Sequence, residues 1–435
     1  MWLTAEIGSQ MSEIAVSPQR ERWMGRHSNV SLRTGLGGRR NSLGLIRLVL
    51  AAAVIVSHGF PLGGFGQDPL VAATRHQISI GEFAVFGFFA ISGYLIMKSG
   101  MRSDILTFLW HRFLRIFPAF WVALLVGALL VGPLVWWASG HPISQYLSAG
   151  PVSPVQYLVG NWRLAIAHYG IADLFLNTPY GHRVHESVLN GSLWTLIHEW
   201  TCYLIVAAFV LFGIARRPRL AQVIVPSVAA IFLIAQVASE YMGVELMRAV
   251  PMFHDPDRVR LVFVFLIGAC IAVFADVIKV DDRLAIAAAV VGVAAALIGG
   301  FQVFGLPALA YLLLWLAARL PERFTRVGAK NDYSYGIYVY GFLVQQVLAF
   351  LGLYRLGYVP FVVAALVATA LIAWCSWHLI ESPALSLKNR GPGRGVKFFV
   401  DRIRGRWRRP KGDLDGDVKQ RPPANADAAR SSDAN

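Results

Sequence analysis

Apolar runs separated by short polar stretches recur along most of the chain. A helix needs about 20 mainly apolar residues to cross a bilayer, and a chain in lipid must satisfy its own backbone hydrogen bonds. The sequence therefore predicts an all-α membrane protein, a polytopic bundle of about ten transmembrane helices. The predicted spans are residues 43–60, 80–97, 116–137, 193–213, 221–240, 259–278, 284–300, 302–318, 333–352 and 359–380.

Charge placement predicts the orientation of this bundle. The 435-residue chain is 56% hydrophobic and has a net charge of +15, but its basic residues are unevenly spread. All the lysines fall in segments that the predicted topology places on the same side as both termini; they are residues 98, 279, 330, 388, 397, 411 and 419. The excess of positive charge on cytoplasmic segments of membrane proteins then predicts that both termini are cytoplasmic.

The two ends of the chain differ in composition from the middle. Residues 1–40 are predicted to form a basic, disordered cytoplasmic tail, residues 41–385 the transmembrane domain, and residues 386–435 a second basic and disordered tail. Because the second tail follows a membrane span, its charge favours contact with anionic lipid over nucleic acid. No cleavable signal pattern is evident, which predicts that the first span is an uncleaved anchor.

One loop, residues 139–192, is much longer than the others and is predicted on the outer side. Loops of this length are usually functional or disordered, which makes it a candidate platform for a ligand. Its His182–His185 pair has the HxxH spacing, but that spacing alone is weak evidence for a metal. We predict no metal site, and a solvated loop is the favoured interpretation.

The first predicted span contains two ionisable residues, Arg47 and His58. Eleven residues of helix turn by about 1100°, so the two side chains lie about 20° apart on one face and roughly 16 Å apart along the axis. One interpretation is that Arg47 snorkels to headgroups while His58 is an interfacial polar residue. The other is that both face a working cavity, as costly intramembrane charges tend to do.

These residues, with five other stretches, resemble the acyltransferase family 3 membrane proteins, which O-acylate bacterial surface glycans and related small molecules. The first span has the family's arginine, ten residues and histidine. The other matching stretches are GFFAISGYLI (87–96), the predicted inner loop WHRFLRIFPAFW (110–121), GSLWTLIHEWTCYL (191–204), DYSYGIYVYGF (332–342) and WHLIESP (377–383). Together they cover roughly residues 41–385 in the order that the family has.

The sequence departs from the family pattern at two places. Phe86 stands where the family often has Asp, and Glu82, one turn earlier on the same helical face, would supply a carboxylate instead. Gly341 stands where the family often has His, which leaves Tyr338 and Tyr340 as the polar groups of that motif. Neither departure affects Arg47 or His58.

The resemblance implies a cytoplasmic acyl-CoA donor and an acceptor hydroxyl on the outer side. Arg112 and Arg115 would bind the CoA phosphates, because a guanidinium offers planar, bidentate donors. The alternative is that these charges only set the topology. Arg47 would extend the cationic path, and an extended pantetheine arm would cover the roughly 16 Å from there to His58.

The resemblance also implies roles for residues of the predicted centre. His58 would act as a general base or accept the acyl group as an acyl-imidazole, and both routes stay open. Glu199, at a similar depth, would either be paired structurally or orient the imidazole. Ser92 and Gly93 favour close helix approach over donation to an oxyanion. Tyr338 is a candidate because the motif includes it.

The predicted function is therefore transfer of an acyl group, with acetyl expected, from acyl-CoA to an extracytoplasmic carbohydrate hydroxyl at the bacterial inner membrane. Acyl-CoA is a cosubstrate, and no bound cofactor is predicted. The alternative is a polytopic secondary transporter, but the chain lacks a clear pair of Gly/Pro-interrupted segments in matching halves. A non-catalytic scaffold would not need Arg47 and His58 on one face. The acceptor, the acyl length and the oligomeric state are left open.

Overall fold

The computed structural model describes residues 30–38 and 41–407, which are helical apart from loops and one isolated bridge between Ser31 and Lys279. Every predicted span coincides with a helix. These helices are α3 (Leu43–Gly63), α5 (Ile80–Gly100), α6 (Ile105–Val126) continued by η1 (Gly127–Val131) and α7 (Gly132–Ala138), α10 (Thr195–Leu211), α11 (Pro218–Met242), α12 (Pro256–Val273), α13 (Asp282–Ile298), η3 (Phe301–Gly305) with α14 (Leu306–Arg319), α15 (Ser334–Phe350) and α16 (Tyr358–Ser376).

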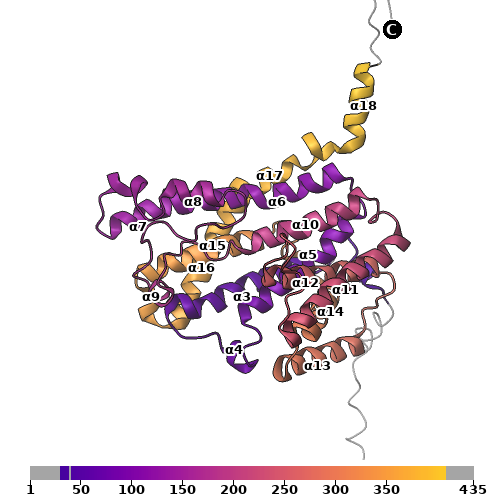
Figure 1. Ribbon diagram of the computed structural model, residues 1–435, viewed down its shortest axis with the longest axis horizontal. Coiled ribbons are helices and arrows are strands. Elements are labelled where there is room, and N and C mark those ends of the chain that lie inside the picture. Colours follow the sequence, from indigo (N-terminus) through magenta and orange to yellow (C-terminus); the bar gives the residue numbers. More distant parts are fainter. Residues whose placement is uncertain (1–29, 39–40, 408–435) are drawn as a thin grey trace, which may run out of the picture.

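Within these described residues, six helical stretches are long and apolar enough to cross a membrane. They are Leu43–Gly63, Ile80–Gly100, Ile105–Ala138, Pro218–Met242, Phe301–Arg319 and Tyr358–Asn389; Thr195–Leu211 is apolar but shorter. The all-helical architecture is thus confirmed, and these stretches support a multi-pass membrane protein, whereas ten crossings and the side of the termini stay predictions. Figure 1 shows α6 and α7 as one long continuous rod along an edge of the bundle.

Helix α5 lies at the centre, packed against α3, α10, α12 and α14. Its contact with α12 depends on two glycines. A Cβ on Gly93 would collide with the carbonyl oxygen of Phe265, and a Cβ on Gly268 would collide with that of Ala90. The two backbones therefore touch, which is the close approach expected of Gly93, and small residues permit it in membrane bundles. This contact fixes α5 relative to α12.

The long loop is folded instead of being merely solvated. It contains η2 (Ile143–Ser148), α8 (Pro154–Asn161) and α9 (Pro179–Val184). The buried Asn161 side chain accepts hydrogen bonds from the backbone N–H groups of Ala167 and His168 and donates to the His168 carbonyl. Helix α9 packs against α3. The loop thus covers one end of the bundle, at the left of Figure 1.

Parts of both predicted tails belong to the folded body. Helix α2 (Leu32–Gly35) has its Leu32 side chain fully buried. After α16 the chain continues through η6 (Trp377–Glu381), α17 (Ser382–Ser386), η7 (Leu387–Asn389) and η8 (Gly391–Arg394) into α18 (Gly395–Trp407). Trp110 of α6 donates to the Leu387 carbonyl over 3.0 Å. The disorder predicted for residues 1–29 and 408–435 concerns positions outside the described residues.

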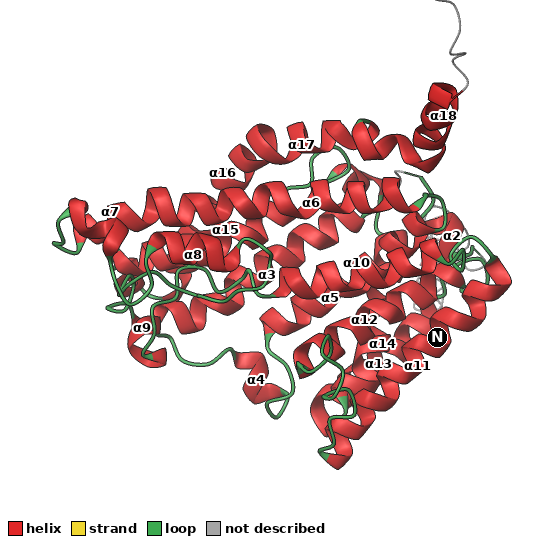
Figure 2. Cartoon of the chain, turned by 45° about the horizontal axis from the view of Figure 1, so that its top comes forward, coloured by secondary structure: helices red, strands yellow, loops and turns green. Residues whose placement is uncertain are grey.

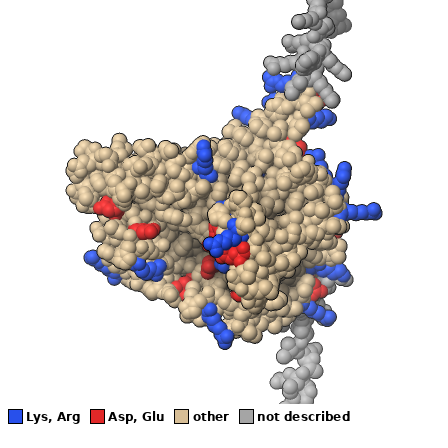
Figure 3. Space-filling model, in the orientation of Figure 1, with Lys and Arg blue, Asp and Glu red and all other residues tan. Residues whose placement is uncertain are grey.

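The charged side chains on the face of Figure 3 are unevenly distributed. Acidic and basic groups gather in a hollow near its middle, while most of the surrounding surface carries neither. Figure 2 shows the helices of the body running roughly along one direction, with loops at their ends.

Candidate active site

A cavity of about 330 Å³ lies between α3, α5, α6, α10 and α15, and the segment after α16 also lines it. We call it the inner cavity because it lies towards the end of the bundle that the sequence predicts to be cytoplasmic. Five of its lining residues are Lys or Arg and two are carboxylates, an excess of three positive charges; they are Arg47, Arg112, Arg115, Lys330 and Lys388, with Glu199 and Asp332. A cavity with this balance favours an anionic ligand.

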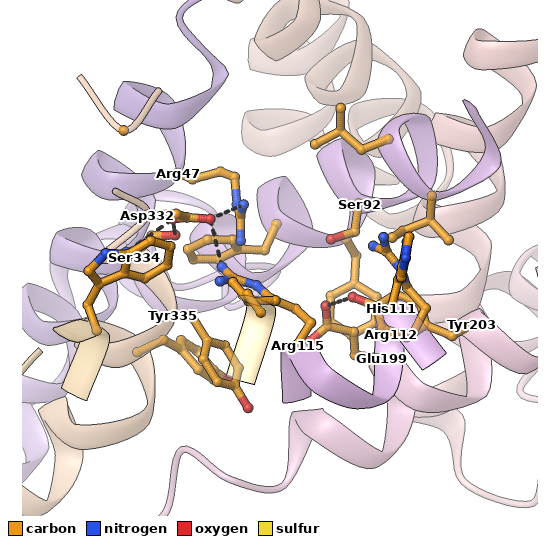
Figure 4. Close-up of a pocket in the computed structure, with 18 of the residues that line it drawn as sticks. Arg47, Ser92, His111, Arg112, Arg115, Glu199, Tyr203, Asp332, Ser334 and Tyr335 are labelled. Atoms are coloured by element: carbon orange, nitrogen blue, oxygen red, sulfur yellow. Dashed lines mark hydrogen bonds and ion pairs between the residues drawn. The ribbon is translucent and has the colours of Figure 1, made fainter. Parts of the chain in front are cut away.

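Asp332 holds two of these arginines. Its Oδ2 accepts hydrogen bonds from Arg47 Nη1 at 2.5 Å and from Arg115 Nη2 at 2.6 Å, and Arg115 Nη1 also lies 3.5 Å from Glu381 Oε2. Ser334 donates to the other oxygen of Asp332 from its hydroxyl at 2.5 Å. Figure 4 shows Arg47 and Arg115 converging on this carboxylate.

The electrostatics of Asp332 follow from these contacts. Burial opposes the charged form of this carboxyl, but the Arg47 and Arg115 guanidinium groups and the Ser334 hydrogen bonds outweigh burial and hold its pKa well below the usual range. The sequence singled out Arg47 and Arg115 but missed Asp332. Its place as the first residue of the DYSYGIYVYGF motif could have drawn attention to it.

Arg112 is differently placed. The sequence predicted an inner loop at 110–121, but these residues lie within α6, which begins at Ile105 after the capping Asp104. The guanidinium of Arg112 lies over the Tyr203 ring at 5.8 Å, and its buried Nε has no hydrogen-bond partner among the described residues. Arg112 thus lacks the carboxylate that Arg115 has.

Glu199 lies in this inner cavity and does not line the cavities that contain His58. It accepts a hydrogen bond from Tyr203, one helical turn along α10. Of the two predicted roles, structural pairing is therefore the one with a contact, and no contact supports orientation of the His58 imidazole. Ser92 also points into this inner cavity (Figure 4).

His58 lines a second, smaller cavity of about 170 Å³, the histidine chamber, which is formed by side chains from α3, α5, α12 and α15 and from the residues before α10. The ring of Phe342 meets the imidazole edge-on, with centroids 5.3 Å apart. Nδ1 of His58 is buried and has no hydrogen-bond partner within residues 30–38 and 41–407. A nitrogen without a structural bond is free to exchange a proton or to bond to a ligand.

The histidine chamber adjoins the inner cavity. Val85 and Tyr338 line the chamber and also the inner cavity. The hydroxyl of Tyr338 lies 2.5 Å from that of Thr195. Arg47 and His58, both on α3, therefore line successive cavities. Glu82 also lines the chamber, but its carboxylate caps α5 by accepting from the backbone and hydroxyl of Ser79.

An outer cleft of about 510 Å³ continues from the chamber, and His58, Trp194 and Asp257 line both. Tyr169 and Tyr180 of the long loop add aromatic surface to this cleft. Burial raises the pKa of both phenols, so they remain neutral hydrogen-bond donors at physiological pH. Aromatic rings with interspersed polar groups suit a ligand that has apolar faces and many hydroxyls.

Asp68, which the sequence analysis missed, stabilises a residue that lines the histidine chamber. Its Oδ2 accepts from the Ser57 hydroxyl at 2.6 Å and from the Ile80 backbone at 2.8 Å, and its Oδ1 accepts from the Leu70 backbone at 2.9 Å. The buried carboxylate thus ties the residue beside His58 to the start of α5. Asp before Pro69 is a readable helix-cap signal, but its bond to Ser57 is not.

Comparison with known proteins gives consistent matches. The acyltransferase domain family matches residues 40–378. The chain is 29% identical to an O-acetyl transferase of Shigella phage Sf6 over 366 residues, which cover 80% of this chain and 99% of that protein. It is 30% identical to Nodulation protein 10 of Rhizobium leguminosarum bv. viciae over 375 residues, 81% of this chain and 95% of that protein. No solved structure matches significantly.

Proposed function

The chain belongs to this family of membrane acyltransferases, and we propose that it transfers an acyl group, with acetyl expected, from cytoplasmic acyl-CoA to a hydroxyl of an extracytoplasmic carbohydrate. The name of the phage relative, an O-acetyl transferase, supports an oxygen acceptor. The proposal places the enzyme in the bacterial inner membrane, with both termini in the cytoplasm.

The observation that carries the proposal is the series of three cavities through the bundle. The inner cavity and the histidine chamber share Val85 and Tyr338, and the chamber and the outer cleft share His58. CoA carries several negative charges that cannot enter hydrocarbon, whereas a slim acyl-pantetheine arm fits between helices. Such a series allows the acyl group to cross without either bulky substrate crossing.

The cations of the inner cavity divide into two groups under this proposal. Arg47 and Arg115 are hydrogen-bonded to Asp332, so they hold the cavity wall in place. They would act on a bound phosphate through their positive electrostatic potential more than through direct contacts. Arg112, Lys330 and Lys388 form no ion pair within the described residues and would contact the CoA phosphates directly. Of the two arginines that the sequence predicted to bind phosphate, the proposal therefore keeps Arg112 and drops Arg115.

His58 carries the chemistry of the proposed transfer. The acceptor hydroxyl oxygen attacks the thioester carbonyl carbon while the imidazole takes the hydroxyl proton; the carbon–sulfur bond then breaks, and the thiolate of CoA receives a proton. The unpartnered Nδ1 of His58 supports a proton-accepting role. Transfer through an acyl-imidazole would use the same histidine side chain and the same cavities.

The test is acyl transfer by purified protein in vesicles, with radiolabelled acetyl-CoA on one side and glycan acceptor on the other. His58→Ala should reduce the transfer rate at least about 100-fold, because general base catalysis gives about 10² to 10⁴. His182→Ala removes an imidazole from α9 that lines none of the three cavities, and should transfer like the wild type. Normal transfer by the His58 variant would refute the proposed mechanism.

A further inference from the structure

Apolar and polar side chains both line the histidine chamber, and we call these two sets of residues its apolar wall and its polar wall. Val54, Phe86 and Leu261 supply the apolar wall from α3, α5 and α12, and at most 3% of each is exposed. The polar wall consists of Ser57, Ser79, Glu82, Ser192, Asp257 and Arg260. The Ser192 hydroxyl is buried without a hydrogen-bond partner in the described chain, so it remains available to a ligand.

We infer that Val54, Phe86 and Leu261 form an acyl pocket, and that Phe86 restricts the transferred group to a short acyl chain. This inference rests on the proposed acyl transfer and adds the residues that select the donor. The acceptor hydroxyl would meet the polar wall, because a hydroxyl brought against the apolar wall would lose its hydrogen bonds.

The direction from which the donor arrives gives the pocket its role. The acyl chain is the leading end of the acyl-pantetheine arm, so it enters the chamber past Val85 and Tyr338 before the thioester reaches His58. The chamber, at about 170 Å³, is smaller than the inner cavity at about 330 Å³ and the outer cleft at about 510 Å³. The smallest space therefore surrounds the reacting group.

The apolar wall cannot move aside easily. Phe86 and Leu261 lie on α5 and α12, whose backbones touch at Gly93, so separating them would require the central helix pair to part. Forcing extra methylene groups into a packed site is unfavourable. One methylene group in an apolar pocket changes kcat/KM by about 10- to 200-fold. A chain two methylene groups longer than acetyl should therefore be strongly excluded.

The experiment is a competition among equimolar acetyl-, propionyl- and butyryl-CoA, with the acylated glycan analysed by mass spectrometry. The product ratio reports relative kcat/KM and does not depend on how much of each variant is folded. The wild type should give mainly acetyl product. Phe86→Ala should raise the butyryl-to-acetyl ratio at least about 10-fold.

Phe89→Ala is the matched control, because Phe89 lies one turn further along α5, is similarly buried and lines only the inner cavity. It should leave the ratio unchanged. Should Phe86→Ala fail to fold, the smaller truncation Leu261→Ala should raise the propionyl-to-acetyl ratio. Equal use of butyryl-CoA by the wild type, or a Phe86→Ala ratio matching the Phe89→Ala ratio, would overturn the pocket. Absence of any acyl transfer by the wild type would instead refute the proposed function.

Discussion

Replacing Asp332 by Asn should destabilise the protein more than the loss of an exposed ion pair does. The carboxylate accepts from Arg47 at 2.5 Å and Arg115 at 2.6 Å, with all three side chains only 15–21% exposed. Each hydrogen bond to a charged group contributes about 1.5–3 kcal/mol, and breaking a buried pair costs about 3–5 kcal/mol. Because the three side chains stay partly exposed, we expect the low end, about 3 kcal/mol, from two guanidinium groups left facing one another.

The assay is thermal unfolding of purified protein in detergent, followed by tryptophan fluorescence. Asp276→Asn is the control, since Asp276 pairs with Arg33 at 2.8 Å but both side chains are 55% exposed. Such a pair contributes at most about 1 kcal/mol. The Asp332 variant should therefore lower the midpoint roughly three times as much as the control. Equal shifts of the unfolding midpoint in the two variants would show that the buried carboxylate of Asp332 stabilises the protein no more than an exposed one.

The pH dependence of this effect has a defined sign. The pKa of Asp332 is held below the value of about 4 that the carboxyl has in an unfolded chain. Its contribution is therefore fully present above about pH 4 and is lost only as the pH falls through the lower folded-state pKa. The stability difference between wild type and Asp332→Asn should stay constant from about pH 5 to 8 and shrink in stronger acid.

Three further substitutions test other parts of the structure. Arg112→Gln should raise the KM for acetyl-CoA about 10-fold while changing kcat less, because it removes a charge-assisted phosphate contact; initial rates at varied donor concentration measure this. Gly93→Leu should prevent recovery of monodisperse protein in gel filtration, since a side chain there meets backbone, whereas Gly292→Ala, which has space for a Cβ, should be recovered normally. Asp68→Asn should lower kcat and change the KM for acetyl-CoA less, because the hydrogen bond that holds Ser57 beside the chamber would weaken. Unchanged kinetics would argue against this role of Asp68.

The sequence predicted the helices well because an apolar run in lipid has few alternatives to a helix. It failed at the start of α6, where Arg112 and Arg115 lower the local hydropathy and suggested a loop. Asp104, whose carboxylate caps the helix, was the signal that would have corrected the boundary. The structure does place Arg47 and His58 in one helix, and their spacing along that helix puts them on one face.

Partners across the bundle were beyond the sequence. Arg47 and Asp332 are 285 positions apart, and only the packing of α3 against α15 brings them together. The sequence put Glu199 near His58 because the two residues have similar predicted depths in the membrane. The structure instead places Glu199 in the inner cavity. Its contact with Tyr203, four residues on, was readable from helical spacing.

The order in which the wall of the inner cavity is completed has a consequence for biogenesis. Trp110 and His111 bond to backbone carbonyls 277 positions later in the chain, and Lys388 from that late segment lines the inner cavity. Translation at about 5–20 residues per second adds those positions only after about 14–55 s. A nascent chain that has not yet acquired this late segment thus has an incomplete cavity wall, and under the proposed function it should not yet bind the acyl donor.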